Sequence, residues 1–196
     1  EFVAAFVKPE NSISSPEEAL DGVRYILAER IVMDAAARKL VRDHMFSEGI
    51  LTSRATKNAE GKKTKFESYY DFSENVAKIP SHRVLAVLRG VKEGLLRIDI
   101  TIDDDKMLND LVALYLNESG SIFDVHIRGA VQEAYTRHLR PAIENELMEL
   151  LRKRADDDAI NVFRQNAQNL LLSPPAGRVS VVGITPSPKA GLALAM

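Results

Sequence analysis

Residues 141–172 read PAIENELMELLRKRADDDAINVFRQNAQNLLL, and this stretch decides the fold class. Pro141 fits the first turn of a helix, and apolar residues then recur at helical spacing. At 1.5 Å per residue, such a helix would be roughly 45 Å long, which is longer than a small bundle needs. We therefore expect a mainly helical fold in which one long helix bridges modules. Its inward side is expected to contain Ile143, Leu147, Leu150, Leu151, Ala155, Ile160, Phe163, Ala167 and Leu170.

The sequence before this stretch predicts the other helices of a multi-helix core. Ser15 is a suitable N-cap for a helix that begins at Pro16, and Glu18 completes a capping box. The buried stripe of this helix is expected to consist of Leu20, Val23, Leu27 and Ile31. Further helices are predicted for residues 34–48, for residues 81 to 90 or 94, for residues 103–117 and for residues 121–139.

Two other segments have different patterns. Residues 95–102, LLRIDITI, alternate apolar and polar side chains and predict a strand. This β segment is nearly isolated among the helices, so it needs a partner strand that the sequence does not identify. Residues 52–65, TSRATKNAEGKKTK, are polar and basic without periodicity, which is typical of an exposed, mobile loop. Residues 66–72, FESYYDF, are expected to form a short helix or turn.

The clearest boundary in the chain lies at residues 173–177, where two prolines and a glycine end the long helix. After it, residues 179–184 (VSVVGI) are typical of a buried strand. A turn over residues 185–191 leads to a second apolar run over residues 192–195. This pattern predicts the opening hairpin of a new domain, and hence that the chain is a fragment of a larger protein.

Composition excludes several classes of function. The 196 residues are 45% hydrophobic and 28% charged, which is ordinary for a soluble globular protein, and the net charge is −2. Any contact with nucleic acid must therefore come from a local basic patch. The absence of cysteine excludes disulfides and thiolate metal sites. The four histidines have no i, i+4 pair, and no apolar run is long enough for a bilayer, so we expect a cytoplasmic protein without metal, cofactor or small-molecule substrate.

Four stretches occur in the order and spacing of one known family. They are EEALDGVRYILAERI at residues 17–31, KFESYYDF at 65–72, IPSHRVLAVLRGVKEGLL at 79–96 and AINVFRQNAQNLLLSPPAGRVSVVGITPSPKAG at 159–191. The motif PSHR-x-LA-x-x-RG and the NLLL-x-PP segment are the most specific, because no generic helix composition requires them. Over essentially its whole length, the chain resembles the Tex family of transcription accessory proteins.

This resemblance implies a bacterial relative of a eukaryotic transcription elongation factor that binds nucleic acid. Tex proteins contain a helical core, a ribonuclease-H-like domain of the YqgF type, helix-hairpin-helix elements and a C-terminal OB-fold RNA-binding domain. Residues 1–172 would then be the helical core, residues 173–177 a linker, and residues 178–196 the first hairpin of a truncated YqgF-type domain. The expected fold is mainly α, with the isolated β segment near residues 95–102 and a C-terminal β-hairpin that begins an α/β domain.

One position departs from the family pattern. The first strand of the YqgF-type domain resembles G-I-D-P-G in the family, whereas residues 183–187 here read GITPS. In ribonuclease-H-like nucleases, the aspartate of this strand is a ligand of a divalent metal ion. Thr185 has a neutral hydroxyl group, which does not replace a carboxylate ligand of Mg²⁺. We therefore expect no nuclease activity at this site and no catalytic residues in the chain.

The candidate phosphate-binding side chains form two groups. Four lysines of the polar loop, which could follow a phosphate backbone or be merely solvated, are Lys57, Lys62, Lys63 and Lys65. The second group belongs to the helix that begins at Ser81 and consists of Arg83, Arg89 and Lys92, with Arg97 downstream of the helix. Free N–H groups at a helix start together with arginine can bind phosphate. The alternative is that Ser81 caps this helix and that its arginines pair with acids of neighbouring helices.

Other polar and aromatic clusters favour structural roles. Residues 152–154 (RKR) and 156–158 (DDD) fit i, i+4 ion pairs along the long helix. Residues 103–105 (DDD) lack the spacing of a calcium loop and suit a helix N-terminus. Tyr69, Tyr70 and Phe72 could stack on bases, although core packing is the simpler interpretation.

Three functions are consistent with these observations. The leading hypothesis is a non-catalytic scaffold that binds RNA or DNA within a transcription accessory protein. A nuclease or resolvase of the ribonuclease-H type is the second, and Thr185 argues against it. The third is a protein-interaction module that docks on RNA polymerase or an associated factor.

Overall fold

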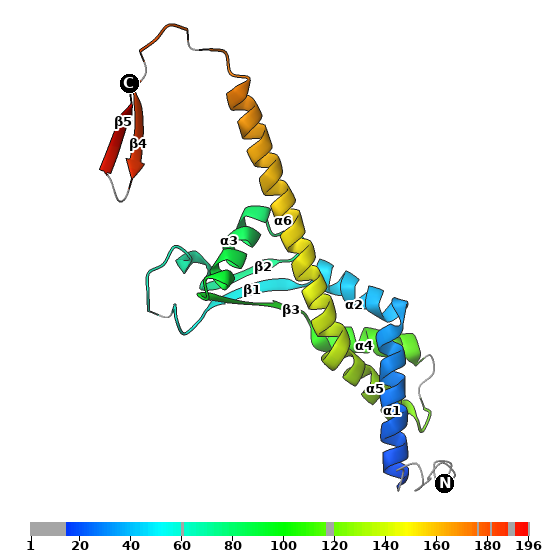
Figure 1. The fold of residues 1–196 in the computed structure, drawn as a ribbon. Helices are drawn as coiled ribbons and strands as arrows, with labels where there is room; N and C mark the ends of the chain where they lie inside the picture. The colour runs from blue at the N-terminus through cyan, green and yellow to red at the C-terminus, as the bar shows by residue number, and fades with distance from the viewer. Residues whose placement is uncertain are drawn as a thin grey trace. The chain divides into compact units, whose positions relative to one another are not determined.

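Helices form most of the chain in the computed structural model, which describes residues 15–59, 61–116, 120–175, 177–180, 182–187 and 191–195. The predicted mainly helical fold with one long helix is confirmed (Figure 1). In chain order the elements are α1 (Pro16–Met33), α2 (Ala35–Ser47), β1 (Ile50–Ala55), the 3-10 turn η3 (Glu67–Tyr69), β2 (Asp71–Asn75), α3 (Ser81–Lys92), β3 (Leu96–Thr101), α4 (Asp104–Tyr115), α5 (Asp124–Ala134), the π-helical turn η4 (Tyr135–Leu139), α6 (Arg140–Leu171), β4 (Gly183–Ser187) and β5 (Gly191–Ala195).

The chain divides into two compact units, Glu1–Ala159 and Ile160–Met196. The first contains α1 to α5, the three-stranded sheet and the first part of α6, and the candidate site lies within it. No helix in the described ranges is both long and apolar enough to cross a bilayer. The linker and domain limits expected around residues 173–177 stay a prediction.

The first two helices are joined by a single capping residue. Ser15 Oγ accepts a hydrogen bond from Glu18 N at 3.2 Å, as the sequence predicts for an N-cap. Asp34 ends α1 and caps α2, because its Oδ1 accepts from Ala36 N at 2.8 Å. Its Oδ2 accepts from the Tyr115 hydroxyl at 2.7 Å, and this hydrogen bond lowers the pKa of Asp34. One residue thus connects α1, α2 and α4.

The buried side of α1 differs from the predicted stripe. Ile31 is buried, but Val23 is 49% exposed, and alanines at positions 19 and 28 take the inner positions. Small side chains allow α1 to approach its neighbour α5 closely, and Gly129 of α5 lies beneath the Arg24 side chain. Which residues of α1 are buried therefore depends on how closely α5 packs against them, and not on which apolar residues of α1 are largest.

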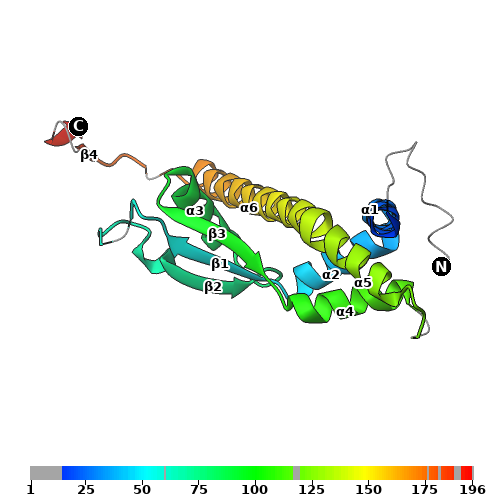
Figure 2. The same cartoon turned by 90° about the horizontal axis from the view of Figure 1, so that it is seen from below.

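The strand predicted over residues 95–102 is not isolated. It is β3, and it pairs antiparallel with β1, which pairs on its other side with β2. The loop predicted over residues 52–65 is therefore shorter, because its first four residues lie in β1. Ser53 is buried in this strand, where its hydroxyl donates to Tyr69 O at 2.7 Å. Figure 2 shows α3 and the first half of α6 on the same side of the three strands.

The long helix does not begin at Pro141. It continues from α5 through η4, where Arg140 N donates to Tyr135 O, five residues earlier. Single π turns occur as bulges within α-helices. This one precedes Pro141, which has no N–H to donate, so the proline changes the hydrogen-bond pattern without ending the helix. The two helices predicted over residues 121–139 and from Pro141 are thus one continuous run.

Only the first part of the predicted inward side of α6 is buried. Its buried residues are Ile143, Leu147, Leu151 and Ala155, which belong to the main core. Leu150 is 52% exposed, and Ile160, Phe163 and Leu170 are exposed as well. The apolar pattern predicted the helix correctly but extended its buried side too far.

Two carboxylates fix α4 and β3 to the continuous helix. Asp104 accepts from the Tyr135 hydroxyl and from Arg140 Nη1, each at 2.5 Å, and burial together with this contact raises the pKa of Tyr135. Glu144 Oε1 accepts from Ile100 N of β3 at 3.2 Å. Burial raises the pKa of Glu144, an effect that the Ile100 hydrogen bond opposes and the neighbouring Asp99 strengthens. The acids of residues 103–105 thus serve the helix start, where Asp103 caps α4 through Lys106 N.

The C-terminal hairpin begins later than predicted. Its first strand, β4, starts at Gly183 rather than at Val179, and it pairs antiparallel with β5. Val179 and Val182 are exposed, whereas the sequence predicts a buried strand there. Thr185 lies inside β4 opposite Ala193, not in a turn. Residues 188–190 of the predicted turn lie outside the described residues.

Gly49, between α2 and β1, has no room for a side chain. A Cβ there would lie 2.1 Å from Met45 O. Because that backbone oxygen cannot rotate away, we expect Gly49→Ala to lower the free energy of unfolding by about 1–3 kcal/mol. Gly22→Ala is the control, since nothing lies within 4 Å of a Cβ at that position of α1, and alanine should stabilise the helix by about 0.5–1 kcal/mol. Urea unfolding measures both, and equal changes would contradict this explanation.

Candidate nucleic-acid interface

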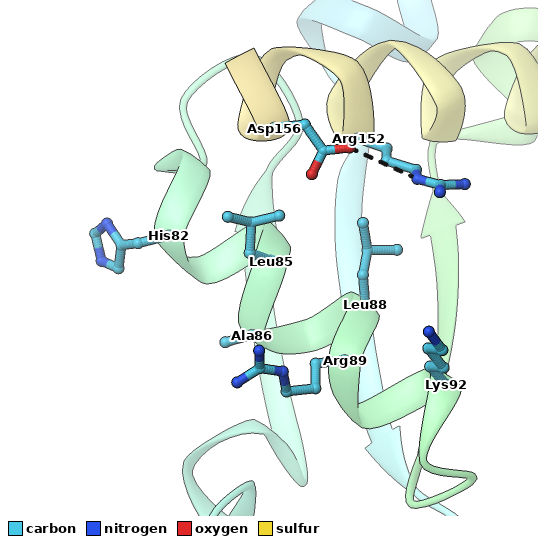
Figure 3. A pocket seen from close by; sticks show the side chains of 8 residues that line it. All are labelled: His82, Leu85, Ala86, Leu88, Arg89, Lys92, Arg152 and Asp156. Atoms are coloured by element: carbon cyan, nitrogen blue, oxygen red, sulfur yellow. Dashed lines mark ion pairs between the residues drawn. The ribbon is translucent and has the colours of Figure 1, made fainter. Parts of the chain in front are cut away.

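A groove of about 720 Å³ separates α3 from the first part of α6 (Figure 3). Leu85 and Leu88 lie on the side of α3 that faces α6 and are partly buried. Exposed cations surround this apolar floor, and Arg152 forms an ion pair with Asp156 at 3.8 Å. The residues that line the groove are His82, Leu85, Ala86, Leu88, Arg89, Lys92, Arg152 and Asp156.

Contacts from α6 fix the start of α3. Arg154 Nη2 donates to Ile79 O at 2.7 Å, and the Ser81 hydroxyl donates to Asp158. The N-cap of α3 is Pro80, which makes no side-chain capping bond, so the expectation that Ser81 caps this helix is wrong. Of the i, i+4 pairs expected along α6, the pair between Arg152 and Asp156 is confirmed. The side chains of Arg154 and Asp158 bind the α3 start instead.

The other end of α3 is placed by two glycines. A Cβ on Gly90 would lie 2.4 Å from Leu96 Cδ1, so the missing side chain lets α3 pack directly on β3. Gly94 has φ 70°, a left-handed conformation that favours glycine. It follows the last helical turn, where Glu93 N donates to Arg89 O. This tight turn places the cations of α3 beside the first residues of β3.

Two of the candidate cations are already paired. Lys65 Nζ lies 2.7 Å from Glu93 Oε1, and Arg83 Nη1 lies 2.9 Å from Glu74 Oε2. Exposed ion pairs of this kind are weak, but they lower the local positive charge. The alternative that the arginines pair with neighbouring acids is therefore correct for Arg83, although its partner lies on β2 and not on a helix.

Five candidate cations form no ion pair within the part of the chain that the structure describes. All five side chains are exposed. We call this group the basic surface, and it consists of Lys57, Lys62, Lys63, Arg89 and Lys92. Arg89 and Lys92 also line the groove. The predicted set of seven thus separates into two paired cations and five that have no ion-pair partner among the described residues.

Both ends of the loop that carries the lysines contact the turn that follows α3. At its start, Thr56 N donates to Leu95 O at 3.0 Å, and the Thr56 hydroxyl donates to Gly94 O at 2.8 Å. At its end, the ion pair of Lys65 with Glu93 reaches the same turn. These contacts bring the lysines of the loop and the cations of α3 to one region.

Hydrogen bonds also order the loop internally. The Tyr70 hydroxyl donates to Lys62 O at 3.1 Å and lies 2.7 Å from Thr64 Oγ1. Phe66 is buried. Tyr69 and Phe72 contact each other edge to face, with ring centroids 5.3 Å apart. The three aromatic residues considered for base stacking are half-buried and hold the loop instead.

The sequence did not identify Arg152 as part of the site. Its local pattern indicates only an ion pair along the helix, which the structure confirms. Its place in the groove depends on the approach of α3, some 60 residues earlier, and no local signal reports that contact. The described ranges contain no cluster of three potential metal ligands.

The model of the Tex central region-like family matches residues 1–163. The chain belongs to the Tex central-region family. This confirms the resemblance noted from the sequence.

Individual relatives agree with this assignment. The transcriptional accessory protein Tex of Neisseria gonorrhoeae is 34% identical over 94% of the chain, which covers 25% of that protein. The protein tex of Bordetella pertussis is 32% identical over 100% of the chain and 26% of its own length. The transcription elongation factor spt6 of Schizosaccharomyces pombe is 30% identical over 57% of the chain and 9% of its own length. The chain spans about a quarter of the length of its two Tex relatives.

Proposed function

We propose that this Tex central region is a non-catalytic helical scaffold that binds the phosphate backbone of nucleic acid through its basic surface. The observation that carries the proposal is a set of five exposed cations that form no ion pair with any described residue. They lie on α3 and on a loop that is attached to the turn after α3, in a chain whose net charge is −2. Cations that already have an acidic partner contribute less to the affinity for phosphate, because the phosphate would have to displace that partner. Phosphate contacts of this kind give affinity without sequence readout.

The names of the relatives supply the proposed context. One is named a transcriptional accessory protein and another a transcription elongation factor. We infer that the chain acts in the cytoplasm beside the transcription machinery, with RNA or DNA as its ligand and RNA polymerase or an associated factor as a further partner. Residues 1–172 would form the scaffold and residues 173–177 a linker. Residues 178–196 would begin a ribonuclease-H-like domain in which Thr185 cannot supply a metal-binding carboxylate.

The proposal can be tested by titrating the chain with single-stranded RNA and with duplex DNA, each at about 50 mM and about 200 mM salt. If the five cations each contact one phosphate, the logarithm of the affinity should fall against the logarithm of salt with a slope of about −3.5 for single strands and about −4.5 for duplex. No binding at the lower salt would refute direct contact and leave only the scaffold role.

The groove supports a second candidate function, docking of a protein. Its floor of Leu85 and Leu88 is apolar, whereas a phosphate backbone is not. If this function is correct, a factor of the transcription machinery should be retained by the chain after nuclease treatment. Loss of that retention on nuclease treatment would favour the nucleic-acid proposal.

A further inference from the structure

Two arginines lie directly opposite each other on the outer side of the sheet. Arg54 of β1 and Arg97 of β3 are register partners, and both side chains are exposed. Neither forms an ion pair within the described ranges. Asp71 of β2 is the register partner of Arg54 on its other side, yet it makes no ion pair with that arginine. Two positive charges therefore lie side by side, and neither has an ion-pair partner among the described residues.

This arrangement opposes the stability of the sheet. Like charges directly opposite each other on antiparallel strands are destabilising, and a local rule is broken most often where function requires it. Arg54 and Arg97 are, moreover, the kind of side chain that binds phosphate with a planar fork of N–H donors. An anion between the two guanidinium groups would convert their repulsion into a pair of attractive contacts.

The surface is hollowed beside this pair. A depression of about 190 Å³ is lined by Thr52, Arg54, Arg97, Ile98, Asp99 and Thr101. The hydroxyl groups of Thr52 and Thr101 donate to backbone oxygens of the sheet, at 3.2 and 3.4 Å. Asp99 is the one acidic side chain in the lining, and its carboxyl group also contacts Glu144 at the edge of β3. Repulsion by Asp99 would confine an anion to the arginine end of the depression.

The arginine end is continuous with the basic surface. Ala55 is the register partner of Leu96, and Thr56 N donates to Leu95 O. Arg54 thus lies two residues before the point where the lysine loop is attached. A backbone that contacts the loop could therefore continue onto the outer side of the sheet.

We propose that Arg54 and Arg97 jointly bind one phosphate group of a nucleic-acid backbone on the outer face of the sheet. This inference rests on the proposed function and extends it to Arg54 and its pairing with Arg97, which the sequence did not indicate. The pair would fix the path of the strand, which runs from the loop across β1 and β3.

The test compares Arg54→Gln/Arg97→Gln with the unaltered chain in a titration with fluorescently labelled single-stranded RNA. Loss of one phosphate contact shared by two arginines should weaken binding at low salt roughly tenfold and reduce the salt slope on a single strand by about 0.7. The control is Lys78→Gln/Arg128→Gln, which removes the same charge from exposed positions away from this face. It should change the affinity about twofold or less, a long-range effect that salt screens.

Thermal unfolding shows whether the double variant is folded, and relief of the repulsion should leave it at least as stable as the unaltered chain. Nuclear magnetic resonance with inorganic phosphate gives a second readout, in which the side-chain Nε–Hε signals of Arg54 and Arg97 should shift together. If the unaltered chain binds RNA but the double variant has the same affinity and slope, the inference is wrong and the proposed function stands. If the unaltered chain binds neither RNA nor duplex DNA, the inference and the direct nucleic-acid contact of the proposed function are both wrong, and only the scaffold role is left.

Discussion

Replacing Leu151 by alanine is expected to lower the free energy of unfolding by about 2–5 kcal/mol. Leu151 is 1% exposed and lies in the buried stripe of α6, between Leu147 and Ala155. Its side chain belongs to the single core that α1, α2, α4 and the sheet share. Truncation removes apolar contacts and leaves a cavity that a backbone held by α5, η4 and α6 cannot easily close. Urea unfolding followed by far-ultraviolet circular dichroism measures the loss.

Leu150→Ala is the matched control, because it makes the same chemical change one residue earlier. Leu150 is 52% exposed, and surface substitutions usually change stability by within about 0.5 kcal/mol. Alanine also favours the helix slightly more than leucine does. A loss at Leu150 as large as the loss at Leu151 would show that this side of α6 has a partner, and the assignment of the buried stripe would then be wrong.

These adjacent leucines also show what the sequence could predict about α6. Helical spacing identifies which residues share one side of a helix. It predicted the buried positions Ile143, Leu147, Leu151 and Ala155 correctly but also placed Leu150 inward, where it is exposed. Burial depends in addition on where the packed elements end. Ile160 is 64% exposed and Phe163 is 74% exposed, although both continue the same apolar pattern. Periodicity contains no information on that limit.

The sheet was predicted only in part for a related reason. β3 has the alternation of a strand along its own sequence, so it was found. The sequence of β1 is ILTSRA, and its polar part was assigned to the following loop. Its strand conformation is set by pairing with β2 and β3, whose residues are about 20 and 50 positions away. A hydroxyl that donates to Tyr69 O lets Ser53 occupy a buried position that the polar pattern argues against.

The sequence indicated which residues could form the candidate site, but not which of these cations are paired with an acidic side chain. Local sequence placed the cations correctly on a loop and on α3. It could not show that Lys65 and Arg83 are paired, because their partners Glu93 and Glu74 are 28 and 9 residues away. The same limitation hid the pair of Arg54 and Arg97, which only the register of β1 against β3 brings together.

Neutralising the whole basic surface is expected to abolish most of the affinity for nucleic acid. The variant replaces all five cations by glutamine: Lys57, Lys62, Lys63, Arg89 and Lys92. The side chains are exposed and form no ion pair within the described ranges, so glutamine should leave the fold intact. Each phosphate contact contributes about 0.7 to the salt slope on a single strand. The slope should therefore fall by about 3.5, and the affinity at low salt by a factor on the order of a hundred or more.

The control must remove equal charge, because a lower net charge weakens binding to any polyanion. Five exposed cations elsewhere in the chain provide it when each is replaced by glutamine: Lys78, Arg128, Lys153, Arg164 and Arg178. If the basic surface contacts phosphate directly, this control should retain most of the salt slope and lose affinity only through the long-range field, which is screened over about 10 Å at 0.1 M salt. Equal losses in both variants would mean that binding reflects net charge alone, since only direct contacts distinguish two sets of the same charge.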